Sequence, residues 1–301
     1  MSVADQASDL RERAEEGKPS PMIPTGLRCL AIGSGKGGVG KTMVAIGTAT
    51  CLARLKYRVL VLDADLGLAN VDLQMGLDPA FTLQDVVYGS CTLEEAVVTA
   101  EDGLDVLAAA SGSPEMVDMG SARRQMLVNE LVRFAARYDF LIIDAGAGIG
   151  KGVTAFLGAA PEVLVVVANE PTSIMDAYSL IKVLRQAPDP PSIMMVINMV
   201  RTLEEGELLA QRLNTITKKF LGVEIPVAGV ITYDAIVGDA IRARTSLIRY
   251  AEKSAPAKCI SELARFITGG GGFPRPVGRV DKPFFDKLAG VGWQAPRAAE
   301  S

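Results

Sequence analysis

The sequence predicts an α/β fold, with a mostly parallel sheet of seven to eight strands and helices on both faces. Two observations predict it. Seven apolar runs are mostly continuous instead of alternating, as in strands that are buried on both faces. Amphipathic stretches separate these runs, and such alternation is typical of parallel strands joined by right-handed crossovers. Because ligands bind at the carboxyl ends of strands in such sheets, we expect the functional residues there.

The same patterns give the residue ranges of the elements. The expected strands are 29–33, 59–63, 104–109, 140–144, 163–168, 193–197 and 227–231. The expected helices are 41–55, 121–137, 173–186, 203–221, 234–244 and 256–268. The first strand runs into a glycine-rich loop, the second and fourth end in acids, and the sixth ends in an asparagine. Each of these four strands therefore delivers polar groups to the same edge of the sheet.

Composition divides the chain into three parts. Over 5–16, Ala7, Leu10 and Ala14 lie at helical spacing among charged residues, so 1–20 is expected to be a short helix on a tether. Residues 27–268 contain all the expected strands and form the main domain. Glycines at 269–272 and three nearby prolines mark a break, so 269–301 is expected to be a flexible linker with a short amphipathic tail.

Composition also excludes several kinds of site. The 301 residues include no histidine, which removes Ser-His-Asp and Cys-His nucleophiles and His-ligated metals. The four cysteines lie far apart with no CxxC pair, so no zinc ribbon, disulfide framework or interfacial iron-sulfur cluster is expected. The net charge of −4 gives no strong nucleic-acid signal. The N-terminus does not resemble a signal peptide and no apolar run could span a membrane, so we expect a cytoplasmic protein.

A phosphate-binding loop follows the first strand. Residues 35–42 read GKGGVGKT, which contains the pattern GxxxxGK followed by Thr, and a helical pattern begins directly after it. The glycines allow backbone N–H groups to surround phosphates, and the helix directs its positive end at them. Lys41 is expected to contact the β- and γ-phosphates and Thr42 to bind Mg²⁺. The alternative is an ordinary glycine-rich turn.

A second lysine, Lys36, lies inside this loop. The sequence KGGVGKT resembles the deviant Walker A motif of the MinD/ParA superfamily of P-loop ATPases, and the resemblance covers about residues 27–267. It implies a P-loop NTPase that hydrolyses Mg²⁺-ATP and forms an ATP-dependent homodimer. In that family the extra lysine reaches the phosphates of the partner subunit, which implies a catalytic role for Lys36 beside Lys41. The alternative is that Lys36 is a solvated loop lysine.

Three acids accompany the loop. The stretch 63–70, DADLGLAN, resembles the family's switch I, which implies that Asp65 positions the attacking water and Asp63 lies near Mg²⁺. A structural capping carboxylate is an equal alternative for Asp63. Asp144 ends the fourth strand and reads as a Walker B acid that holds Mg²⁺, partly through water. The family usually has Thr after this Asp, where this chain has Ala145.

Two further residues complete the expected nucleotide site. Asn198 resembles the asparagine that contacts adenine in the family, and Asp234 lies in a loop that often touches the base. The expected ATP-binding residues are therefore Gly35, Lys36, Gly37, Gly38, Val39, Gly40, Lys41, Thr42, Met43, Asn198 and Asp234.

The N-terminal segment indicates the branch of the family. Residues 5–11, DQASDLR, resemble the motif of the FlhG family (also called FleN or YlxH), MinD-like ATPases that control flagellar number and placement. The resemblance implies that this helix binds an FlhF-like SRP-type GTPase and stimulates its hydrolysis, with other flagellar basal-body or transcription-factor proteins as further partners. The partner-binding residues are then Asp5, Gln6, Ala7, Leu10 and Arg11.

Several alternatives stay open. The segment 5–11 could instead be a frayed terminal helix. The rival functions are a MinD-type cell-division or ParA-type cargo-positioning ATPase, and a nucleotide-sensing adaptor that restrains a flagellar transcription factor. Phe284, Phe285 and Leu288 lie on one helical side of the tail, which predicts either peripheral contact with the cytoplasmic face of the inner membrane or docking on the main domain.

Overall fold

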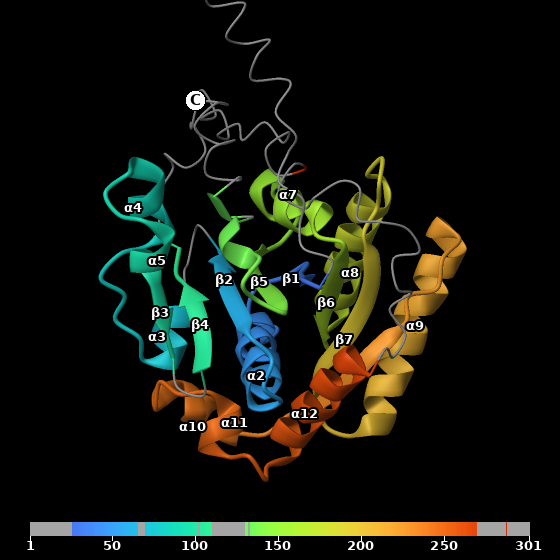
Figure 1. Cartoon of the computed structure of the whole chain (residues 1–301). Helices are drawn as coiled ribbons and strands as arrows, with labels where there is room; N and C mark the ends of the chain where they lie inside the picture. The colour runs from blue at the N-terminus through green and yellow to red at the C-terminus, as the bar shows by residue number, and fades with distance from the viewer. Residues whose placement is uncertain are drawn as a thin grey trace, which may run out of the picture.

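The computed structural model describes residues 26–65, 70–100, 103–109, 130–131, 133–269 and Lys287. The expected N-terminal helix lies outside these residues, as do most of the helix expected over 121–137 and nearly all of the tail. Within the described residues, one sheet with helices on both faces makes up the domain (Figure 1).

The sheet contains eight strands in the order β3-β4-β2-β5-β1-β6-β7-β8. All neighbouring strands are parallel except β3, which is antiparallel to β4. All seven expected strands are present, and their bounds are β1 (Arg28–Ser34), β2 (Val59–Ala64), β4 (Leu104–Leu107), β5 (Phe140–Ala147), β6 (Glu162–Ala168), β7 (Ser192–Val200) and β8 (Val227–Thr232). The eighth is β3 (Val97–Thr99). The prediction of a mostly parallel sheet is confirmed.

Two groups of helices cover the two faces. One face carries α2 (Lys41–Arg54), α10 (Ile236–Arg242), α11 (Leu247–Tyr250) and α12 (Ala255–Thr268). The other face carries α4 (Leu83–Tyr88), α5 (Leu93–Ala96), α7 (Lys151–Ala159), α8 (Pro171–Arg185) and α9 (Leu203–Leu221). A short helix, α3 (Val71–Met75), follows β2 and contacts α10. The helices α2 and α12 pack against each other and lie near one another in Figure 1.

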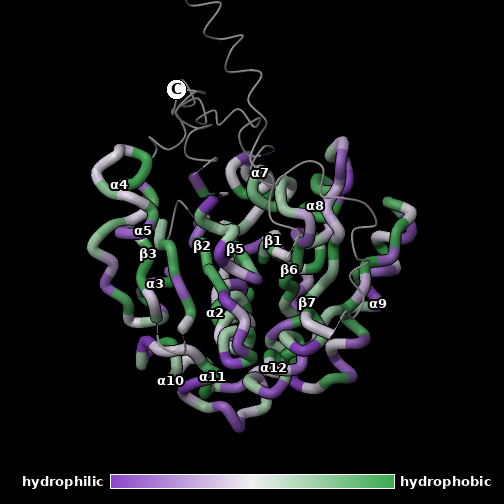
Figure 2. Tube along the Cα trace, viewed as in Figure 1, coloured by the Kyte–Doolittle hydropathy of each residue, from purple (hydrophilic) through white to green (hydrophobic). Residues whose placement is uncertain are grey.

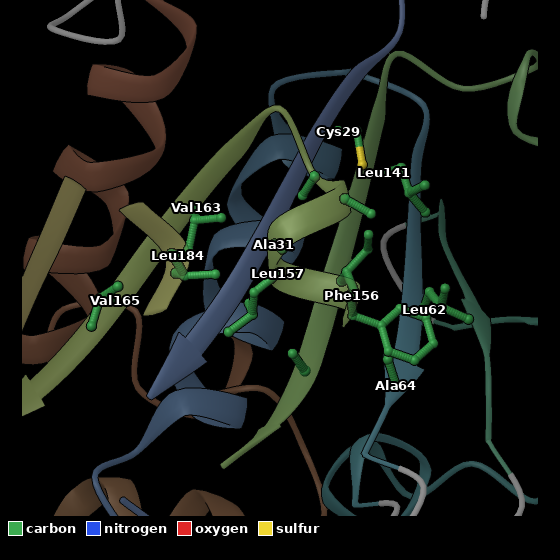
Figure 3. Close-up of a cluster of buried hydrophobic side chains, with 14 of the residues drawn as sticks. Cys29, Ala31, Leu62, Ala64, Leu141, Phe156, Leu157, Val163, Val165 and Leu184 are labelled. Atoms are coloured by element: carbon green, nitrogen blue, oxygen red, sulfur yellow. The ribbon is translucent and has the colours of Figure 1, made fainter. Parts of the chain in front are cut away.

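The continuous apolar strands supply two separate cores. On β1, Cys29 and Ala31 pack into the cluster under α7, α8 and α9, whereas Leu30 and Ile32 pack into the cluster under α2 and α12. Successive side chains of a strand point to opposite faces, so a strand in the middle of the sheet must be apolar at every position. Figure 3 shows the first cluster, where the central strands meet α7 and α8 through Phe156, Leu157 and Leu184.

Hydropathy along the chain agrees with this layering. The central strands are mostly apolar, and the helices alternate between apolar and polar positions (Figure 2). Within the described ranges, none of the helices combines the length and the hydrophobicity that crossing a bilayer requires.

The structure adds elements that the sequence patterns missed. The strand β3 and the helices α3, α4, α5 and α11 are all six residues long or shorter, and a hydrophobic period cannot be measured over such lengths. The nine-residue helix α7 contains Gly152 and Gly158 and follows a run of glycines, which hides its helical pattern. By contrast, α9 has the expected bounds, and Thr202 caps it by accepting a hydrogen bond from the Glu205 N–H.

Candidate nucleotide-binding site

The phosphate loop connects β1 to α2, at the centre of the sheet. Gly38 has a φ of 79° and Gly40 a φ of 84°, which are conformations that glycine adopts without strain. A Cβ atom on Gly40 would lie 2.3 Å from Nδ2 of Asn198. Gly40 is also the N-cap residue of α2, so the free N–H groups of that helix open into the loop. This arrangement suits an anion at the helix N-terminus.

The start of the loop rests directly on α8. A Cβ atom on Gly35 would lie 2.2 Å from the backbone carbon of Asp176 and 2.7 Å from the backbone nitrogen of Ala177. Backbone atoms cannot move aside as a flexible side chain can, so only glycine fits at this position. Among the described residues, no heavy atom lies within 4 Å of a Cβ on Gly37, so that side of the loop is open with respect to them.

Three of the expected residues meet at Asp144, in the C-terminal half of β5. Nζ of Lys41 lies 2.7 Å from Oδ1 of Asp144, and the hydroxyl of Thr42 donates to Oδ2 of Asp144 at 2.7 Å. Asp144 and Lys41 are buried, with 1% and 7% of their surfaces exposed. Burial raises the pKa of the Asp144 carboxyl, and the Lys41 ammonium and the Thr42 hydroxyl act against this rise.

The neighbouring acid, Asp63, is paired with Asp144 across β2 and β5. It is fully buried, and its carboxylate accepts backbone N–H groups from Asp65 at 3.0 Å, Asn70 at 2.9 Å and Val71 at 3.1 Å. Burial and the nearby Asp144 charge raise the pKa of Asp63 to about 6, although the three N–H groups lower it. This geometry favours the capping alternative, since the carboxylate fixes both ends of the segment after β2.

Asp65 lies at the same edge of the sheet, beside the segment that follows Asp144. A Cβ atom on Gly146 would lie 3.5 Å from Oδ1 of Asp65, so the residue that follows β2 lies close to the C-terminal part of β5. The charge of Asp65 also reaches Asp144, where it acts to raise the pKa of that buried carboxyl. The structure thus brings Lys41, Thr42, Asp63, Asp65 and Asp144 together.

Asn198 and Asp234 occupy different surroundings. Asn198 is buried at 1% exposure and its Nδ2 donates to the carbonyl of Val39 at 2.8 Å, so it supports the phosphate loop from β7. Asp234 follows β8, and its Oδ1 accepts from the N–H of Ile236 at 2.9 Å at the start of α10. Met43 is buried in the core beneath α2, so only its backbone can face a ligand.

Lys36 has partners on its own subunit. Its Nζ contacts Glu170, with which it forms an ion pair, and lies 3.1 Å from the hydroxyl of Thr172. Sequence reasoning missed both partners, because Glu170 and Thr172 lie in a segment that reads as packing. The available signal was an acid, Glu170, two positions after an apolar strand and directly before Pro171. The expected partner-binding residues Asp5, Gln6, Ala7, Leu10 and Arg11 lie outside the described residues.

The residues present fit a magnesium nucleotide. The open backbone at Gly37, the positive φ of Gly38 and Gly40, and the cation of Lys41 suit a chain of phosphates. Thr42 and Asp144 supply the hydroxyl and carboxylate oxygens that Mg²⁺ prefers, at hydrogen-bond distance from one another.

Comparisons with known proteins agree with this site. The model of the CobQ/CobB/MinD/ParA nucleotide-binding domain matches residues 30–247. The chain is similar to the antiactivator FleN of Pseudomonas aeruginosa, with 38% identity over 80% of this chain and 86% of that protein. It is also similar to the flagellum site-determining protein YlxH of Helicobacter pylori, with 31% identity over 79% of this chain and 81% of that protein.

Solved structures show the same fold. The MinD cell-division protein of Aquifex aeolicus, in its complex with MinC, superimposes with a TM-score of 0.66. The match covers 80% of this chain and 96% of the solved chain, with 27% identity.

Proposed function

Because the chain belongs to the MinD/ParA family of P-loop ATPases, and within it to the FleN and YlxH branch, we propose that it is the ATP-driven switch that sets flagellar number and placement. The single observation that carries this proposal is a phosphate loop with a second lysine, Lys36, in a chain that is 38% identical to FleN. The chain is an ATPase, and its cofactors are ATP and Mg²⁺.

We propose a role for each of the site residues, and the support is their positions around the phosphate loop. Lys41 and the backbone N–H groups of 35–42 would hold the phosphates, and Thr42 with Asp144 would hold Mg²⁺. The bound nucleotide supplies the phosphoanhydride bond and the charge that Mg²⁺ partly neutralises. Asp65 accepts a proton from, or orients, the attacking water. Asp63 keeps Asp65 in position by holding its backbone N–H.

The switch is a monomer-dimer equilibrium. We propose that Lys36 crosses to the phosphates of a partner copy, so that ATP favours the dimer by its higher affinity for that state. The dimer binds partners, and hydrolysis returns the protein to monomers. We expect ADP, which lacks the γ-phosphate, not to sustain the closed state.

The partner that we propose is an FlhF-like GTPase, bound through Asp5, Gln6, Ala7, Leu10 and Arg11. The support is the DQASDLR segment together with the similarity to two flagellar proteins. Contact of the tail with the inner membrane is a further part of this proposal, and its support is the apolar side formed by Phe284, Phe285 and Leu288.

A pull-down tests the assignment to flagellar control. The full chain, and a variant that lacks residues 1–20, are each incubated with an FlhF-type GTPase, and GTP hydrolysis is measured as well. The full chain should bind and stimulate, and the shortened chain should not stimulate. If neither chain binds, the division-site or cargo-positioning alternative is favoured, to which the similarity to MinD points.

A second candidate function is restraint of a flagellar transcription activator by binding alone. The observation that favours it is the description of the Pseudomonas aeruginosa relative as an antiactivator. The two functions differ in how partners affect the rate of ATP hydrolysis. Phosphate release that rises on addition of partners supports the switch, whereas tight, ATP-dependent binding of an activator with no change in phosphate release supports restraint.

A further inference from the structure

We propose that Glu170 is the resting partner of Lys36, an ion pair within one subunit that keeps the lysine from the partner copy until two ATP-loaded subunits meet. The inference rests on the proposed function, since it assumes that Lys36 acts in the dimer. It adds a positioning residue, Glu170, whose effect on dimerisation is opposite to that of Lys36.

The contacts place the lysine on the first turn of α8. Nζ of Lys36 contacts the carboxylate of Glu170 and lies 3.1 Å from the hydroxyl of Thr172. Glu170 is the N-cap residue of α8, and Pro171 begins the helix. The Lys36 and Glu170 side chains remain 39% and 57% exposed, so both can exchange partners without opening the core.

The backbones on both sides of this pair are fixed. The Ser34 hydroxyl donates to the carbonyl of Lys36 at 2.9 Å, and Gly35 touches the backbone of α8 at Asp176. On the other side, the N–H of Ala168 donates to the buried Ser173 hydroxyl at 3.0 Å, which ties the first turn of α8 to the end of β6. Release of Lys36 therefore requires only side-chain rotation, while the loop and the helix stay in contact.

The charges of Lys36 and Glu170 determine whether their ion pair favours or opposes dimerisation. The single ammonium of Lys36 cannot pair fully with Glu170 and with a triphosphate on the partner subunit. When Lys36 turns to the partner, the Glu170 carboxylate loses the cation with which it is paired, and the loss of this attraction opposes dimerisation. The pair thus lowers the affinity of the dimer and sets the ATP and protein concentrations at which it forms.

The change in dimer affinity can be estimated from the solvent exposure of the Lys36–Glu170 pair. Exposed ion pairs change an equilibrium by a factor of about 1.4 to 5, and a symmetric dimer opens two of them. Replacement of Glu170 by a neutral residue should therefore tighten the dimer by about 2- to 30-fold. The buried pair of Lys41 and Asp144 lies in the same site, but its exchange would require a much larger change in solvation.

The experiment compares Glu170→Gln with the wild-type chain. Glutamine keeps the size of the side chain and removes its charge. The dimer dissociation constant is measured by analytical ultracentrifugation with a magnesium complex of a non-hydrolysable ATP analogue. Glu207→Gln, which neutralises an exposed acid on α9, is the matched control. Binding of a fluorescent ATP analogue to dilute monomer reports whether either change alters the nucleotide site itself.

Two further variants separate this proposal from the proposed function. Lys36→Ala should remain monomeric with the analogue, and the double variant Lys36→Ala with Glu170→Gln should remain monomeric too, because Glu170 acts through the lysine. The proposal is supported when Glu170→Gln tightens the dimer, Glu207→Gln does not, and the double variant does not dimerise.

Two outcomes overturn it in distinguishable ways. A Glu170→Gln dimer that is unchanged or weaker, with Lys36→Ala still monomeric, removes the resting role of Glu170 and leaves the dimer switch intact. Wild-type dimerisation by Lys36→Ala removes the role of Lys36 in the dimer, and with it both proposals.

Discussion

Nζ of Lys41 lies 2.7 Å from Oδ1 of Asp144, so the cation of the phosphate loop is held by a carboxylate of β5. Lys41 is the first residue of α2 and Asp144 lies in β5, 103 positions apart in sequence. In this arrangement each charge neutralises the other inside a buried site. Phosphates would take the place of the carboxylate at Lys41, and Asp144 would then be available to Mg²⁺.

Removal of Asp144 should destabilise the chain without nucleotide. Asp144→Ala leaves the buried ammonium of Lys41 without its carboxylate, and the loss of one partner of a buried pair costs about 3–5 kcal/mol. Urea unfolding measures the difference. As a control, Asp239→Ala removes an exposed ion pair with Arg242 and should cost less than about 1 kcal/mol. Equal unfolding midpoints for Asp144→Ala and the wild type would contradict this interpretation.

Asp65→Ala should trap an ATP-bound dimer. The variant keeps Lys41, Thr42 and Asp144 for binding, but it lacks the carboxylate that we assign to the attacking water. The loss of a positioned base lowers hydrolysis by about 10²- to 10⁴-fold. Sedimentation with Mg²⁺-ATP should show a dimer that persists for hours, together with a loss of phosphate release. An ATP-bound variant that stays monomeric would count against the assignment.

The contact between Gly35 and α8 should be intolerant of a single methyl group. Gly35→Ala places a Cβ 2.2 Å from a backbone atom of Asp176, whereas the Cβ of Gly37→Ala meets no atom within 4 Å in the part of the chain that the structure describes. We expect Gly35→Ala to lose about 1–3 kcal/mol of stability, as overpacked sites do, and to bind ATP at least tenfold more weakly. Thermal unfolding and nucleotide titration measure both quantities, with Gly37→Ala as the matched variant. Comparable stability and ATP affinity for the two variants would refute the close packing.

The ion pair of Arg58 with Asp139 predicts a pH effect. Hydrogen bonds from the Arg58 side chain and from its backbone N–H hold the pKa of Asp139 below its ordinary value of 3.8. A carboxyl group whose pKa is lowered by folding stabilises the protein at pH values above its ordinary pKa. That stability is lost as the pH falls through the folded-state pKa. The wild type should therefore be more stable than Asp139→Asn at pH 7.

The difference between these two proteins should shrink as the pH falls from about 5 to 2, because both then carry a neutral group at position 139. Denaturant unfolding across this range measures the difference. A difference that stays constant to the lowest pH would show that the carboxylate charge contributes nothing.

The sequence predicted the strands and the phosphate loop well because both leave strong local patterns. The run over 140–144 is apolar and ends in Asp144, and the loop has an unusual density of glycine and lysine. The pairing of Lys36 with Glu170 was not predictable in this way. It depends on β1 and β6 being neighbours in the sheet, which places two residues 134 positions apart side by side.

The role of Asp63 shows a second limit of prediction from the sequence. A carboxylate at the end of a strand is compatible with a metal ligand and with a backbone cap, and the residue type is the same in both cases. Only the positions of the Asp65, Asn70 and Val71 N–H groups favour one of them. For Asn198, the sequence indicated the correct edge of the sheet, but the contact with the Val39 carbonyl needed the folded chain.

The order of the strands in the sheet has a consequence for the synthesis of the protein. Strand β5 lies between β1 and β2, yet the ribosome makes it more than 70 residues after β2. A nascent chain that has emerged only as far as residue 130 has its phosphate loop but lacks the acid that neutralises Lys41. The ability to capture nucleotide should therefore arise abruptly during translation, when the middle strand inserts, and ATP in the cell would favour completed chains over partial ones.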